Sequence, residues 1–256
     1  MGLVIMDIYF GVSSRNPVEL EVVKEVNPNC IMLSFYYWKN RKLKDLIEYL
    51  EYKPKIMIDS GGYSGKVDTY SYCKWLKENE DYIDWYISSD YRPQVMDYKY
   101  EDYLPNNQLK LFQEEKNRFS EIYAELTCNE FMLFEDFGLN YPVPVFHYGL
   151  SEKYIDMYIE NFGCSYIALG NTVSSLHHLK LYKWVNYLTD KYMIDFHVLG
   201  STGKKIIQNC SLLKSCDSTT WIMRSKVYGE PKTLKRVKER GKYQMLEILN
   251  NKSKSA

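Results

Sequence analysis

Short apolar runs alternate with amphipathic segments along most of the chain. The runs are rich in β-branched and aromatic residues and predict eight strands, at 3–10, 31–36, 55–59, 84–90, 143–148, 165–170, 195–200 and 214–219. Between most of them, apolar positions recur three and four residues apart and predict helices, at 40–52, 69–82, 151–162 and 174–192. Alternating strands and helices predict a parallel sheet, and eight strands predict an α/β fold closed into a (β/α)8 TIM barrel.

The connections favour a closed barrel over an open sheet. No G-x-G-x-x-G follows the first predicted strand, so a doubly wound dinucleotide-binding sheet, the main alternative, lacks its best support. The longest connection, 91–141, predicts an insertion between the fourth and fifth strands; a segment that shapes the substrate site and a plain long loop with a helix are both open. No linker or repeat divides the chain, so we expect one catalytic domain over 1–256 with a basic C-terminal helix and tail.

The composition is typical of a globular protein with one large core. The chain has 256 residues, 45% of them hydrophobic, and no apolar run reaches the roughly 18 residues of a membrane span. The first residues lack a basic leader with a cleavage site, so we expect a cytoplasmic protein without a membrane partner. Six cysteines are scattered without a C-x-x-C pair, which favours reduced thiols over a disulfide framework or a zinc site.

Charge is distributed unevenly along the chain. The formal net charge is zero, yet 200–256 holds 13 Lys and Arg against 4 Asp and Glu. A basic C-terminal segment permits a polyanionic partner such as a nucleic acid, although such a segment is more often a solvated surface helix.

Polar residues and glycines gather where the predicted strands end. In a barrel the carboxyl ends of all strands share one face, where active sites lie. The residues at these ends are Asp59, Asp90, His147, Tyr148, Gly170, Asn171, Gly200 and Asp217. Three aspartates on one face suggest general acid–base chemistry, a carboxylate nucleophile or a metal site. Each aspartate alone has a plainer explanation, as a turn cap or the partner of a neighbouring residue.

Six short motifs stand at these strand ends in a fixed order. They are DSGGY, SD, HYGLSEKY, YIALGN, FHVLGSTG and SCDSTTWIMR, within 55–224. In this order they resemble the active-site motifs of the tRNA-guanine transglycosylase superfamily, and most of all those of its phage and bacterial members that insert deazaguanines into DNA.

The resemblance implies a role for each matching residue. Asp217 matches the aspartate that attacks C1′ of the nucleotide sugar, and Asp59 matches the acid/base aspartate. Tyr63 matches the aromatic residue that stacks on the purine, and Asp90 matches the carboxylate that binds a guanine-like base. The other substrate-binding residues implied are Ser60, Gly61, Gly62, His147, Tyr148, Gly170, Asn171 and Arg224.

The implied activity is exchange of guanine in a polynucleotide for a free 7-deazaguanine base through a covalent aspartyl-glycosyl intermediate. The superfamily's tRNA enzymes carry a zinc site after the last strand. No cysteine or histidine follows Cys216, so we expect no metal and no other cofactor, and we favour DNA over tRNA as the substrate. Tyr148 stands where the family has a glutamine that reads the base. The enzyme would then act in the cytoplasm, if phage-encoded in that of the host.

Three alternatives remain open at this point. They are a tRNA-guanine transglycosylase with a shortened C-terminus, a barrel N-glycosidase that acts on a free nucleoside or sugar, and a non-catalytic module that binds modified bases. The oligomeric state is also open, a homodimer included.

Overall fold

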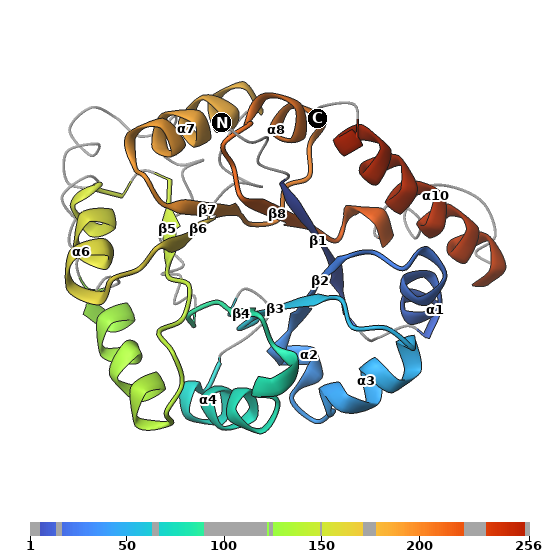
Figure 1. The fold of residues 1–256 in the computed structure, drawn as a ribbon, viewed down its shortest axis with the longest axis horizontal. Helices are drawn as coiled ribbons and strands as arrows, with labels where there is room; N and C mark the ends of the chain where they lie inside the picture. Colours follow the sequence, from blue (N-terminus) through green and yellow to red (C-terminus); the bar gives the residue numbers. More distant parts are fainter. Residues whose placement is uncertain are drawn as a thin grey trace, which may run out of the picture.

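Eight parallel strands form a ring with helices on its outside (Figure 1). The computed structural model describes residues 6–13, 17–62, 67–89, 122, 125–148, 150–170, 178–222 and 234–253. The strands are β1 (Asp7–Val12), β2 (Cys30–Ser34), β3 (Lys55–Asp59), β4 (Trp85–Tyr86), β5 (Val145–His147), β6 (Tyr166–Gly170), β7 (Asp195–Val198) and β8 (Ser215–Ser218).

The sheet closes on itself. Its strand order is β4-β3-β2-β1-β8-β7-β6-β5, so β4 and β5 are the two edges. A parallel bridge between Ile87 and Val143 joins these edges. The Ser88 N–H donates to the Val143 carbonyl at 2.9 Å, and the Val143 N–H donates to the Tyr86 carbonyl at 2.8 Å. The predicted (β/α)8 barrel is therefore confirmed, and the open-sheet alternative is wrong.

The helices cover the outer surface of the ring (Figure 1). They are α1 (Pro17–Val26), α2 (Phe35–Trp38), α3 (Leu43–Leu50), α4 (Thr69–Glu78), the 3-10 helix η1 (Glu80–Tyr82), α6 (Lys153–Phe162), α7 (His178–Lys191), α8 (Lys204–Asn209) and α10 (Leu234–Ser253). Residues 125–136 are also helical and belong to the predicted insertion; 91–121 lies outside the described residues.

Several element boundaries differ from the sequence prediction, most clearly in the first, second and fourth strands. Strand β1, Asp7–Val12, continues two residues beyond the predicted end at residue 10, and the fourth strand is reduced to Trp85–Tyr86. The predicted strand 31–36 ends at Ser34, because Phe35–Trp38 turns into α2 with Phe35 and Trp38 buried. Over so few residues, aromatic and apolar positions fit a strand as well as a helical turn.

Alternation along the strands divides the buried residues into two groups. One group fills the space between the ring and the helices. The other fills the ring itself and contains Tyr9, Cys30, Met32, Met57, Ile87, Val143, Val145, Tyr166 and Ala168. Because side chains on a strand alternate in direction, Asp59 continues the inward face of Met57, His147 that of Val145, and Gly170 that of Ala168. Asp217 is inward too, since it pairs in register with Tyr9.

The basic C-terminal helix lies against an acidic N-terminal one. Helix α10 packs on α1. The Lys238 ammonium pairs with Glu21 at 2.9 Å and with Glu25 at 2.6 Å, and the Lys242 ammonium pairs with Glu25 at 3.3 Å. The hydrogen bond from Lys238, and then that from Lys242, lowers the pKa of Glu25. Part of the charge that suggested a polyanionic partner is therefore balanced within the chain.

Candidate active site at the carboxyl ends of the strands

Asp217 is buried, and its two recorded hydrogen-bonding partners lie at the same carboxyl oxygen. It is 7% exposed. Its Oδ1 accepts a hydrogen bond from the Gly200 backbone N–H at 2.7 Å and lies 3.1 Å from Nε2 of His197. Among the described residues, no hydrogen bond to the second oxygen, Oδ2, is recorded. A buried carboxylate is costly unless it is hydrogen-bonded, and here both recorded contacts are on the same oxygen, Oδ1.

A polar chain continues from Asp217 toward the amino ends of the strands. Nδ1 of His197 lies 2.6 Å from the Ser215 hydroxyl, which is hydrogen-bonded in turn to the Tyr166 hydroxyl. His197 and Ser215 are fully buried, and Tyr166 is nearly so. The edge of the Tyr9 ring meets the His197 ring, with centroids 5.9 Å apart.

Sequence reasoning missed His197, Ser215 and Tyr166. The signal was available in part, since Ser215 stands two residues before Asp217 on one strand and therefore shares its face. The pairing of His197 with Ser215, however, depends on the register between β7 and β8, which a single sequence does not show.

Asp59 ends β3 on the inward side. It is half-buried and pairs in register with Ser34 at the end of β2. The following Ser60 is fully buried, and its hydroxyl accepts a hydrogen bond from the Gly62 N–H at 3.4 Å. The predicted acid/base residue is thus at the carboxyl end of the barrel, as is Asp217.

Gly61 is required by the local packing. Its φ is +84°, and a Cβ there would lie 2.5 Å from Cβ of Tyr36 and 2.6 Å from Oγ of Ser34. A side chain at this position would meet both a strained backbone and a filled space. The glycine is explained by the fold, and its predicted contact with a base stays a prediction.

At the end of β5, the two neighbouring candidates His147 and Tyr148 point in opposite directions. His147 is buried on the inward face of β5, and its ring lies against Gly170, where a Cβ would be 2.5 Å from both Cε1 and Nδ1. Tyr148 points to the helical layer, where its ring meets Trp184 of α7 edge-on at 5.2 Å between centroids. Of the two, His147 is the one on the inward face of the barrel.

Four predicted site residues lie outside the described residues: Tyr63, Asp90, Asn171 and Arg224. Their predicted roles stay predictions.

Two buried glutamates near the strand ends were also missed. Glu19 of α1 accepts hydrogen bonds from the backbone N–H and the hydroxyl of Ser13 after β1, at 2.7 Å and 2.9 Å. Glu130, in the helix over 125–136, accepts one from the Ser89 N–H at 2.7 Å. Each ties a loop after a strand to the helix layer, which is a structural use of a buried carboxylate.

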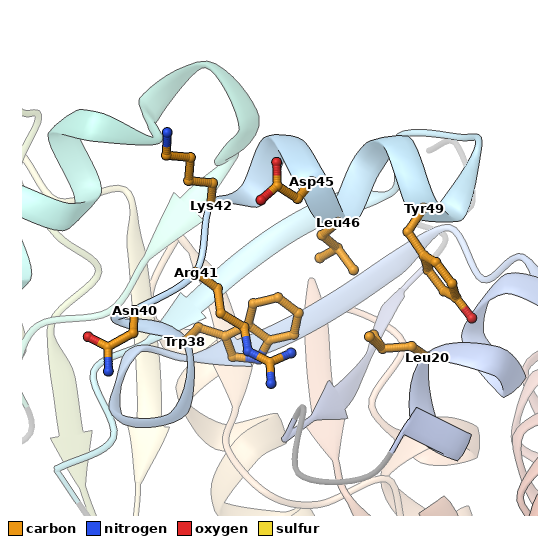
Figure 2. Close-up of a pocket in the computed structure, with 8 residues that line it drawn as sticks. All are labelled: Leu20, Trp38, Asn40, Arg41, Lys42, Asp45, Leu46 and Tyr49. Atoms are coloured by element: carbon orange, nitrogen blue, oxygen red, sulfur yellow. The ribbon is translucent and has the colours of Figure 1, made fainter.

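A pocket of about 490 Å³ lies away from these residues, on the outside of the ring. It is lined by Leu20, Trp38, Asn40, Arg41, Lys42, Asp45, Leu46 and Tyr49. Figure 2 shows the Arg41 guanidinium against the Trp38 ring. The carbon of the guanidinium group, Cζ, lies 5.4 Å from the ring centroid. None of the predicted site residues lines this pocket.

The described part of the chain shows neither a metal-binding cluster nor a membrane-spanning helix. The described residues contain no group of three or more His, Cys, Asp or Glu side chains arranged to hold a metal ion. Nor do they include a helix with the length and apolar content that crossing a membrane requires.

Comparisons with known proteins identify the fold. No protein-family model matches the chain, and no curated protein matches it. The YdjI aldolase from Escherichia coli K12 is similar in structure, with a TM-score of 0.55, 12% identity and coverage of 96% of this chain and 91% of that one. A mutant tryptophan synthase alpha-subunit from Pyrococcus furiosus has a TM-score of 0.54, 10% identity and coverage of 98% and 100%. At such identities the likeness shows a TIM-barrel fold, one that these enzymes share.

The expected membership of the tRNA-guanine transglycosylase superfamily is wrong. No family model supports it, and the structural relatives are TIM-barrel enzymes of other kinds. The physical reason is that the motifs coincide with strand ends, where any such barrel needs turns and close packing. Gly61 and Gly170, which helped to carry the resemblance, are both explained by neighbouring side chains.

Proposed function

We propose that the protein is a glycosyl-transferring enzyme that exchanges the base of a nucleotide in a polynucleotide, with Asp217 as nucleophile. The observation that carries the proposal is the asymmetry of the Asp217 carboxylate. Oδ1 is held by His197 and by the Gly200 N–H, whereas no hydrogen bond to Oδ2 is recorded among the described residues. A buried, oriented carboxylate with one oxygen left over is suited to attack an electron-poor carbon.

The reaction balances with two carboxyl groups. In the first step Oδ2 of Asp217 forms a bond to C1′ of the sugar while the bond from C1′ to the base nitrogen breaks. The departing base takes a proton from Asp59. In the second step the incoming base gives its ring proton to Asp59 and attacks C1′, which releases Asp217. Nothing is oxidised or reduced, and the sugar keeps its configuration because two displacements occur.

The two bases expected from the sequence motifs are kept in the proposal as the substrates to be tested. We propose guanine as the leaving base and a 7-deazaguanine as the entering one, in DNA before tRNA. A base stacked in a duplex cannot reach the interior of a barrel mouth, so the nucleotide must be unpaired or flipped.

The interior residues do not favour the Schiff-base chemistry of a lysine-dependent aldolase. Among the described strands, the lysine on the inward face is Lys55, at the amino end of β3. Its ammonium pairs with Asp7 at 2.8 Å, on the side opposite the carboxyl ends. A carboxylate is therefore better placed than an amine to act as nucleophile at the carboxyl ends.

The test is exchange of radiolabelled guanine into a single-stranded DNA oligonucleotide that contains guanine, with unmodified tRNA as the second acceptor. We expect wild-type exchange and a loss on the order of 10³-fold or more in Asp217→Asn, since the nucleophile is removed. Asp195→Asn is the matched control. Asp195 begins β7 at the opposite end of the barrel, is half exposed and pairs with Lys214 at 3.3 Å, so the same chemical change should leave exchange intact.

A second readout detects the covalent intermediate directly. Wild-type protein denatured during turnover should carry an SDS-resistant oligonucleotide adduct that Asp217→Asn lacks. Exchange that survives in Asp217→Asn would overturn the proposal. So would the absence of exchange with both acceptors, or hydrolysis of free nucleosides without a polynucleotide, which would indicate an N-glycosidase.

A further inference from the structure

Three consecutive hydrogen bonds link the candidate nucleophile to a tyrosine deep in the barrel. Tyr166 on β6 is bonded to Ser215 on β8, Ser215 to His197 on β7 at 2.6 Å, and His197 to Asp217 on β8 at 3.1 Å. No proton positions are seen in such a chain, but the donors and acceptors available limit where the protons can be.

Tyr166 fixes the direction at one end. Burial is the main reason that the pKa of its hydroxyl is raised, so the hydroxyl keeps its proton. Among the described residues, the one recorded hydrogen-bond partner of the Tyr166 hydroxyl is the Ser215 oxygen. Tyr166 therefore donates and Ser215 accepts.

The remaining protons follow in order. The Ser215 hydroxyl has a single proton, which is then directed at Nδ1 of His197. Since Nδ1 accepts a hydrogen bond, it carries no proton, and the ring proton is on Nε2. That proton points at Oδ1 of Asp217, where it makes a charge-assisted hydrogen bond.

We propose that Tyr166 and Ser215 are positioning residues that hold His197 neutral, with its proton on Nε2, so that no positive charge on the ring offsets the Asp217 carboxylate. The part of this inference that concerns catalysis rests on the proposed function, because it concerns the charge around the carboxylate that attacks the sugar. In a positively charged His197, Nδ1 would carry a proton and would have to donate it to the Ser215 oxygen. The proton of the Ser215 hydroxyl would then be left without an acceptor. His197 is fully buried and has both ring nitrogens engaged, so it acts through Asp217 and not on substrate.

The first experiment reads the protonation state without any substrate. The chain has four histidines, so protein labelled with ¹⁵N-histidine gives few enough signals for a long-range ¹H–¹⁵N correlation spectrum to resolve them. The His197 ring is assigned by its contact with the Tyr9 ring, and independently by the signals that disappear in His197→Gln. We expect the pattern of a neutral ring protonated at Nε2, at neutral pH. A ring protonated at Nδ1, or at both nitrogens, would overturn the inference.

A matched pair of serine variants tests whether Ser215 donates the hydrogen bond to Nδ1 of His197. Ser215→Ala removes the donor to Nδ1, so the Nδ1 resonance should move toward that of an unbonded nitrogen. Ser218→Ala makes the same change on the same strand, but Ser218 is bonded to Thr220 instead of His197, so the His197 signals should stay in place. An unchanged Nδ1 resonance in folded Ser215→Ala would contradict the assigned hydrogen bond.

A second pair of variants tests the consequence for the reaction. The side-chain amide nitrogen of glutamine can replace Nε2 of histidine as a donor, whereas that of asparagine reaches only the position of Nδ1. We expect His197→Gln to keep most of the guanine exchange rate, and His197→Asn to lose about 10²-fold in kcat with little change in KM, since misorientation of a catalytic group has that effect. Equal losses in both variants would indicate a purely structural role.

The outcomes separate this inference from the proposed function. A neutral His197 protonated at Nε2 in a protein without base exchange would end the proposed function and leave the proton assignment standing. Exchange by a protein whose His197 is doubly protonated would do the reverse.

Discussion

Asp217 and Asp59 face the same barrel interior, but the chain holds their surroundings by different means. Around Asp217 the contacts are polar: His197 of β7, Ser215 of β8 and the backbone N–H of Gly200, after β7, are linked to it by hydrogen bonds. After Asp59 the backbone runs so close to Ser34 and Tyr36 that Gly61 has no room for a side chain. One side is fixed by hydrogen-bond direction and the other by steric fit.

The difference predicts which property each side controls. Changing a polar atom beside Asp217 should alter chemistry more than stability, since the volume of the site is kept. Adding a carbon atom after Asp59 should alter stability first, because closely packed interiors tolerate little extra volume.

The largest stability effect is expected for Gly61→Ala. The new Cβ combines a left-handed backbone with overlap onto Tyr36 and Ser34, so we expect a loss of about 2 to 4 kcal/mol in the free energy of unfolding. Urea unfolding followed by circular dichroism measures it. Gly163→Ala is the control: Gly163 has a φ of +62° with no heavy atom within 4 Å of its Cβ position, so the backbone strain alone should cost about 1 to 2 kcal/mol. Equal losses in the two variants would show that contact with Tyr36 and Ser34 adds nothing.

The next effect is expected for Gly170→Ala, at about 1 to 3 kcal/mol. Here φ is ordinary, and the cost comes from the His147 ring at 2.5 Å and from Cγ1 of Val145 at 2.9 Å. The same change in a His147→Ala background should cost less, because the ring that obstructs it is gone. A double-mutant cycle measures this coupling, and additive losses would contradict the steric explanation.

A smaller effect on stability is expected for Asp217→Asn, even though guanine exchange should be lost. The amide oxygen can still accept from His197 and from the Gly200 N–H, while a buried charge is removed. We expect a free energy of unfolding within about 1 kcal/mol of the wild-type value. A loss as large as that in Gly61→Ala would mean that the carboxylate holds the fold, and the contrast between the two sides would fail.

The two sides also differ in what the sequence could predict. The pattern of the sequence predicted eight strands and the closed barrel, because short apolar runs alternate with amphipathic helical segments along the chain. Strand 55–59 was predicted with its observed bounds, and this placed Asp59 correctly at a strand end. Asp217 was likewise predicted to lie at the end of the last strand. The pattern of residues along the chain was enough to place both aspartates.

What the sequence could not show depends on register and on close approach. His197 joins Asp217 only because β7 and β8 pair with His197 opposite Ser215. Gly170 and His147 likewise meet across β5 and β6. The family resemblance failed for a related reason. Packing in this barrel already requires glycines at the strand ends, so their presence is no evidence of the active site of one particular family.

The smallest effect is expected outside the barrel, at the ion pairs between α1 and α10. Lys238→Ala removes the main hydrogen bond that lowers the pKa of Glu25. A carboxylate with a lowered pKa stabilises the fold above the pKa it has when unfolded, and this contribution is lost as the pH falls through its folded value. The melting temperature of Lys238→Ala should therefore fall slightly below wild type at neutral pH, and the two should converge in acid and in 1 M salt. Lys235→Ala, an exposed change on the same helix with no ion pair recorded among the described residues, should show no such pH dependence. A difference that persists in acid would mean that the Lys238 side chain acts by packing, as long cationic side chains can, rather than by charge.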